Sequence, residues 1–61
     1  MSDPEFVNRT ALGMIRNFPD SAAREAEVLS QRYGRKNDHE ASALWLAVAR
    51  AVRQSQKTPA G

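Results

Sequence analysis

Apolar residues recur every three or four positions in three successive segments of this chain, and Pro or Gly separates the segments. At 100° per residue this spacing places them on one face of a helix, whereas no stretch keeps the alternation of a half-buried strand. The pattern predicts an all-α fold, a small three-helix bundle with helices over about 4–17, 20–33 and 38–55. We expect residues 1–55 to form a single domain and 56–61 to be a disordered tail.

Each predicted helix carries an apolar stripe that we expect to face the core, and Trp45 is expected to anchor that core. Gly13 lies inside the first helix, where it costs about 1 kcal/mol relative to Ala, and we interpret it as the mark of a close approach between helices. The stripes are Val7, Ala11, Met14, Ile15 and Phe18 in the first segment, Ala22, Ala26, Leu29 and Tyr33 in the second, and Ala41, Leu44, Trp45, Val48 and Val52 in the third.

Residues with capping chemistry stand at the predicted helix ends. Asp3 before Pro4 fits an N-cap followed by the first helical residue. Gly34 fits the left-handed residue that commonly ends a helix. Asn37 and Glu40 have the spacing of a capping box at the start of the third helix.

A chain of 61 residues buries only about 60% of the surface that its unfolded form exposes, so its stability is expected to be marginal. It has no Cys, which excludes disulfides and the usual Cys-based zinc site. No apolar run is long enough to span a membrane, and the acidic start lacks the layout of a signal peptide. We therefore expect a cytoplasmic protein with no membrane contact.

The order of charges has two interpretations. Acidic residues open each predicted helix and basic residues close it, which complements the helix dipoles. The alternative is a small nucleic-acid-binding accessory protein, because phosphate binding needs clustered cations. Its contacts would be Arg32, Arg35, Lys36, Arg50 and Arg53.

No motif for catalysis, a cofactor or a metal is present. His39 is the only histidine, and its neighbours Asp38 and Glu40 point in different directions on a helix, so the three do not converge on an ion. The serines have no base to activate them, and the three glycines are too scattered to cradle a phosphate. We expect a protein that is not an enzyme and binds no cofactor, metal or small molecule.

Phe6, Leu12 and Leu46 do not fit the apolar stripes. Exposed apolar residues that gather into a patch often mark a binding surface, and a dimer would also relieve the shortage of core. The sequence thus predicts a non-catalytic protein-interaction or regulatory accessory protein, which binds another protein or forms a homodimer. Its contacts would be these three residues, with Arg50 and Arg53 as a charged rim. The alternative is that the three-helix core is wide enough to bury Phe6 and Leu12.

Residues 11–54 resemble a group of short bacterial helical proteins to which no activity is assigned. In that group an apolar helix, a Pro- or Gly-containing turn and an Ala-rich helix precede a last helix with a central Trp. The resemblance implies a small helical domain and no site residues. The loop 34–38 is longer than the group's usual Gly-Asp. The matching stretches are Met14-Ile15-Arg16-Asn17-Phe18-Pro19-Asp20, Ala22-Ala23-Arg24-Glu25-Ala26 and Ala41-Ser42-Ala43-Leu44-Trp45-Leu46-Ala47-Val48.

Overall fold

The structure is a computed structural model that describes residues 4–57, and three α-helices account for most of them. The helices are α1 (Pro4–Asn17), α2 (Ala22–Arg35) and α3 (His39–Lys57). No strand occurs within this range. The predicted all-α, three-helix fold is confirmed.

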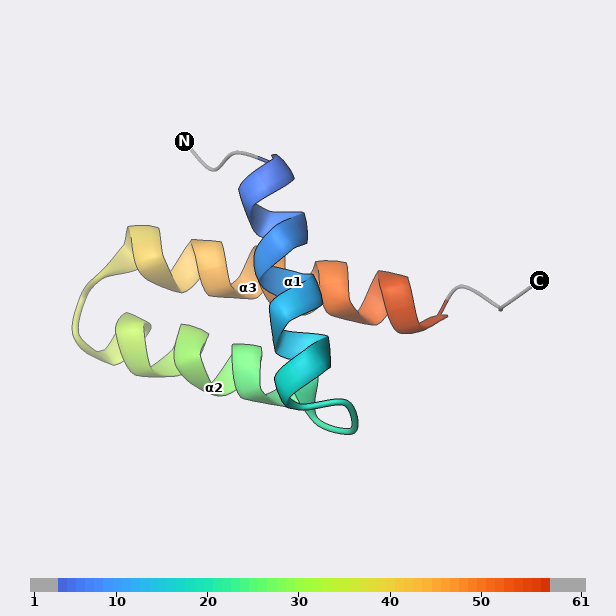
Figure 1. Ribbon diagram of the computed structural model, residues 1–61. Helices are drawn as coiled ribbons and strands as arrows, with labels where there is room; N and C mark the ends of the chain where they lie inside the picture. The colour runs from blue at the N-terminus through green and yellow to red at the C-terminus, as the bar shows by residue number, and fades with distance from the viewer. Residues whose placement is uncertain (1–3, 58–61) are drawn as a thin grey trace.

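The helices form two layers (Figure 1). A short loop joins α2 and α3, which run antiparallel as a hairpin and share the largest interface in the molecule. α1 lies across one side of this hairpin and touches both of its helices, α3 more than α2. The Cα atoms extend only 16 Å in the thinnest direction. Two helices packed 8–10 Å apart need about 13–15 Å, so no third layer within residues 4–57 covers the opposite side of the hairpin.

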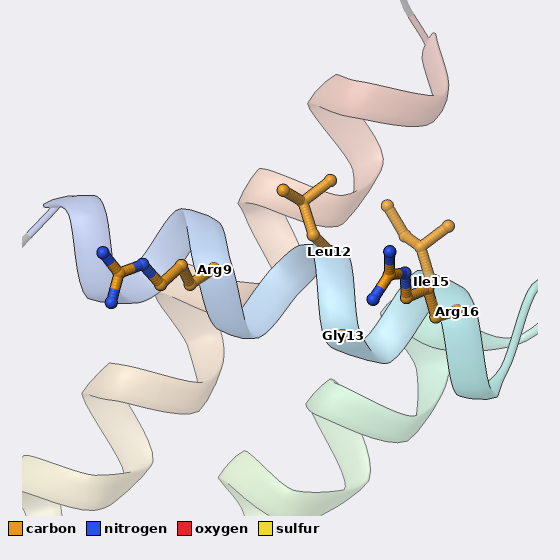
Figure 2. Close-up of a pocket in the computed structure, with 5 residues that line it drawn as sticks. All are labelled: Arg9, Leu12, Gly13, Ile15 and Arg16. Atoms are coloured by element: carbon orange, nitrogen blue, oxygen red, sulfur yellow. The ribbon is translucent and has the colours of Figure 1, made fainter.

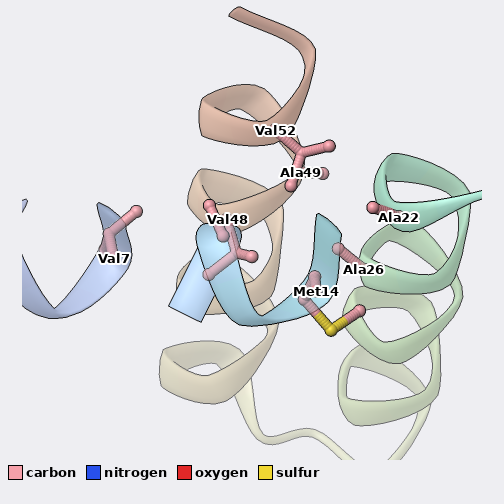
Figure 3. Packing of buried hydrophobic residues seen from close by; sticks show 8 residues of the cluster. Val7, Met14, Ala22, Ala26, Val48, Ala49 and Val52 are labelled. Atoms are coloured by element: carbon pink, nitrogen blue, oxygen red, sulfur yellow. The ribbon is translucent and has the colours of Figure 1, made fainter. Parts of the chain in front are cut away.

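The buried core consists of small side chains, and all three helices contribute to it (Figure 3). The largest side chains that are fully buried belong to Val48 and Val52. Trp45 packs against this cluster as predicted, but it is only half-buried and is not among the fully buried residues of the core. The buried apolar residues are Val7, Ala11, Met14, Ala22, Ala26, Val48, Ala49 and Val52.

Only part of the predicted apolar stripe on the hairpin reaches this core. The buried residues of α2 lie between Ala22 and Ser30, and those of α3 between Val48 and Val52. Leu29, Tyr33 and the residues between 41 and 45 are half-buried or exposed. This follows from the angle at which α1 crosses, because a helix lying across a hairpin covers one portion of it.

The second helix begins and ends two residues later than predicted. After Asn17 the chain turns through Pro19, and the backbone N–H of Ser21 donates to the carbonyl of Phe18 at 3.1 Å. Ser21 is then the N-cap, and its carbonyl accepts from Glu25 at 2.8 Å. Asp20 therefore belongs to the turn.

The end of α2 also differs from the prediction. Gly34 is helical, and the left-handed conformation falls to Asn37, with φ 63°. Asn tolerates this region better than most residues with a side chain. Asp38 follows it in the loop, so Asn37 does not stand immediately before α3 and is not its N-cap. That role passes to Asp38, whose Oδ1 accepts from the backbone N–H of Ala41 at 3.1 Å.

Neither Gly13 nor Gly34 has the role that the sequence predicts for it. A Cβ added at Gly13 would meet nothing within 4 Å, so α1 makes no close helix contact there and the prediction is wrong. A Cβ at Gly34 would lie 3.4 Å from Oγ of Ser42, at the point where α2 approaches α3 closely. There the hydroxyl of Ser30 donates to the carbonyl of Ser42, and the hydroxyl of Ser42 donates to the carbonyl of Ser30, both at 2.8 Å.

The last helix is longer than predicted. It begins at His39, one residue late, and continues through Gln56 and Lys57, two residues that were assigned to a disordered tail. Nε2 of Gln56 donates to the carbonyl of Pro19 at 3.2 Å, which ties this end of α3 to the turn between α1 and α2. Residues 58–61 of the predicted tail and the predicted cap at Asp3 lie outside the described residues.

Candidate partner-binding surface

The three apolar residues that did not fit the stripes all lie at the surface. The exposed fractions are 52% for Phe6, 57% for Leu12 and 42% for Leu46. The alternative that a wide core buries Phe6 and Leu12 is therefore wrong.

These three residues do not form one patch. Leu12 lies two positions from buried Met14, and two positions on a helix turn a side chain 160° away. Leu46 has the same relation to buried Val48, so it points to the side of the hairpin that α1 does not cover. Phe6 and Leu12 are six positions apart, which places them about 120° apart around α1. The structure thus separates Leu46 from the other two.

Leu46 does share a stripe with the two arginines predicted as its rim. Arg50 and Arg53 follow it at four and seven positions along α3, on the same side of the helix. Arg53 is not a free cation, because its guanidinium forms a salt bridge with the carboxylate of Glu27 on α2. This salt bridge connects the two helices of the hairpin on the side that carries Leu46.

A matching set of exposed residues lies on α2, and of these the sequence analysis named only Arg35, as a candidate contact to nucleic acid. Val28 is 43% exposed, and Arg24 and Arg35 occupy the same side of the helix. Arg24 and Val28 are each two positions from buried Ala26, so they point away from the core as Leu46 does. The sequence could have revealed their exposure, because Arg24 and Val28 each lie two positions from Ala26, a residue of the predicted apolar stripe. We call the side of the hairpin opposite α1 the outer hairpin face; its exposed residues include Arg24, Val28, Gln31, Arg35, Leu46, Arg50 and the salt-bridged Arg53.

The two helices bring these residues into register. Ser30 bonds to Ser42 and Glu27 to Arg53 across the antiparallel pair. Leu46 lies between Ser42 and Arg53 along α3, so it stands beside the turn of α2 that begins at Glu27. The outer hairpin face therefore carries an exposed apolar residue from each helix, Val28 and Leu46, at a similar level along the hairpin.

A shallow hollow lies on α1 (Figure 2). Arg9 and Arg16 stand at its two ends, and Gly13 leaves space between them because it has no side chain. Leu12 and Ile15 supply its apolar part. All five lining residues come from this one helix, so no second element encloses a ligand.

The remaining predicted residues lie in solvent. Arg32 is exposed on α2, Lys36 is exposed in the loop, and His39 is exposed at the start of α3. Across residues 4–57, no group of three His, Cys, Asp or Glu side chains lies close enough to hold a metal ion. In the same range no helix is both long and apolar enough to pass through a membrane.

Comparison of the chain with protein-family models, curated proteins and solved structures finds no match.

Proposed function

We propose that this protein is a non-catalytic interaction module, an accessory protein that acts by binding another protein chain. One observation carries the proposal: in the described range every Phe, Leu, Ile, Trp and Tyr side chain is exposed or half-buried. The buried core is left to Ala, Val and a single Met. Several large apolar side chains are therefore exposed, where a partner can cover them, namely Phe6, Leu12, Phe18, Val28 and Leu46.

The free energy that is gained when apolar side chains are buried supports a binding role for the exposed ones. Fully burying a Leu or Phe side chain stabilises by about 1.5–3 kcal/mol, and small domains have little stability to spare. A chain that leaves its largest apolar residues at the surface forgoes that stabilisation when alone and recovers it in a complex. A few well-packed anchor residues, most often Trp, Tyr and Arg, dominate binding energy at protein interfaces, and arginines are abundant on this surface.

The test is capture of partners with tagged protein, combined with sedimentation to detect self-association. Single variants Phe6→Glu, Leu12→Glu and Leu46→Glu each place a charge on one of the three separate exposed positions. We expect at least one variant to lose a bound protein, or to lose self-association, while circular dichroism shows that its helices remain. Retention of every captured protein by all three variants, together with a monomer at all concentrations, would contradict the proposal.

A nucleic-acid-binding function is the second candidate, because Arg24, Arg35 and Arg50 lie together on the outer hairpin face without a carboxylate partner in the described range. Arg53, one of the cations predicted for this role, is already paired with Glu27. Several phosphate contacts would make the affinity for duplex DNA or RNA fall steeply between about 50 and 200 mM salt. An affinity that is absent, or insensitive to salt, would exclude this candidate.

A further inference from the structure

We propose that the outer hairpin face binds an acidic amphipathic helix of another protein, with its apolar side chains on Val28 and Leu46 and its carboxylates on the surrounding arginines. This inference rests on the proposed function and specifies the partner's chemistry. Two independent features of the face carry it, an unbalanced positive charge and an apolar centre.

The charge of the face is positive and has no internal compensation. Arg24, Arg35 and Arg50 have no carboxylate within salt-bridge distance in the range 4–57. Glu27, the acid beside the face, already accepts from Arg53. Three guanidinium groups are therefore available to a negatively charged partner, and Arg binds carboxylates with two parallel hydrogen bonds.

The same charges exclude a second copy of this chain as the occupant. A two-fold symmetric dimer brings the same patch of both subunits together. Six unpaired arginines would then meet in one interface with no acid to balance them, and like charges placed against each other cost several kcal/mol. The face thus requires a partner of opposite charge.

The apolar centre favours a protein over a nucleic acid. Val28 and Leu46 are each more than 40% exposed and belong to the two facing helices. A phosphate backbone would satisfy the arginines but would leave these side chains without an apolar contact. An amphipathic helix satisfies both, because acidic residues can flank a stripe of Leu or Val at spacings of three and four.

The dimensions of the face set the length of the segment. Arg24 and Arg35 are eleven positions apart on α2, which corresponds to about 16 Å along the helix axis. A partner helix of about three turns spans that distance. It would pack against two helices whose backbones are held close together at Gly34 and Ser42.

The experiment is a selection from a phage-displayed library of random peptides long enough for about four helical turns. The immobilised target is the full chain, and the selected peptides are synthesised and their affinities measured. We expect enriched sequences to carry Asp or Glu beside apolar residues spaced three and four apart. Binding should fall at least about tenfold in both Arg50→Glu and Leu46→Ser, the scale of a central interface residue.

Matched controls lie on the other side of the molecule. Arg9→Glu and Arg16→Glu make the same charge change as Arg50→Glu at exposed positions on α1, and the selected peptides should bind them as they bind the unchanged protein. Circular dichroism and thermal melting confirm that all four variants are folded. Peptides that lose affinity in the α1 variants instead, or a library that yields no binding sequence, would overturn this inference.

Duplex DNA and vesicles containing phosphatidylglycerol are measured with the same variants. Binding of either probe with an affinity that Leu46→Ser leaves unchanged, and no acidic peptide from the library, would show that the arginines serve phosphates. Failure of this inference is distinguishable from failure of the proposed function. In the first case a protein partner depends on Phe6 or Leu12, whereas in the second no protein binds at all.

Discussion

Replacing Gly13 with Ala should stabilise this protein, although the position lies in the middle of a helix that touches both others. The added Cβ would meet nothing within 4 Å, so the substitution has no steric cost. Ala is favoured over Gly in a helix interior by about 0.8–1.0 kcal/mol. In a domain of this size, that change raises the melting temperature by roughly 4–8 °C.

Thermal unfolding followed by circular dichroism provides the assay, at several protein concentrations. Gly34→Ala is the matched control. Its Cβ would lie 3.4 Å from Oγ of Ser42, between two helices that are joined by hydrogen bonds at that point. Because this distance is at the short limit of ordinary van der Waals contact, we expect Gly34→Ala to raise the melting temperature less than Gly13→Ala does.

A lower melting temperature in Gly13→Ala would refute the reasoning. It would mean that the backbone at Gly13 touches another body in solution. If the loss grew with protein concentration, that body would be a second copy seated in the hollow between Arg9 and Arg16.

Three further predictions concern the interior and the helix ends. Ser30→Ala and Ser42→Ala should each lower the free energy of unfolding by about 0.5–1.5 kcal/mol in urea denaturation, and the double variant should lose less than the sum, because the two hydroxyls share one network. Val48→Ala should cost about 1.6 kcal/mol for the two lost carbons plus a cavity term, and an unchanged urea midpoint would show that the site is not buried in solution. Asp38→Ala should cost about 1 kcal/mol, because it removes the acceptor for the backbone N–H of Ala41, whereas an equal loss in Asp38→Asn would contradict a capping role.

The periodicity of apolar residues was sufficient to predict three helices, because each apolar stripe runs for at least three turns. It was insufficient to predict how far each stripe is buried. Leu29, Tyr33 and Trp45 continue the apolar stripes of α2 and α3, yet all three are only half-buried, although Leu29 and Trp45 pack against the core. The crossing angle decides this, and no spacing within a single helix encodes it.

The helix ends show a similar limit. Gly34 and Asn37 can both adopt the left-handed conformation, and the sequence pattern favoured Gly. In the structure Gly34 remains helical where α2 approaches α3 closely, and the left-handed conformation falls to Asn37. Asn37 was then the remaining residue able to turn the chain.

The candidate site also has one part that the sequence could predict and another that it could not. The exposure of Leu46 could be predicted from the third helix alone, because Leu46 and Val48 lie on opposite sides of that helix. Val28 and Arg24 lie on the same face as Leu46 because α2 pairs with α3. The sequence does not give this pairing, and the structure shows it through the contacts of Ser30 with Ser42 and of Glu27 with Arg53. The only reason to group Phe6 and Leu12 with Leu46 was that none of the three fits an apolar stripe. The two-layer arrangement separates Phe6 and Leu12, which lie on α1, from Leu46 on the other side of the hairpin.

The interfaces between the three helices differ in size, which implies that the helices unfold locally in a definite order. α1 shares less contact with the hairpin than α2 and α3 share with each other, and its buried residues are Val7, Ala11 and Met14. Partial unfolding releases the least tightly held unit first. Backbone amides of α1 should therefore exchange with deuterated water sooner than those in the middle of α2 and α3. The protein would then pass through a state in which the hairpin persists while its first helix is detached.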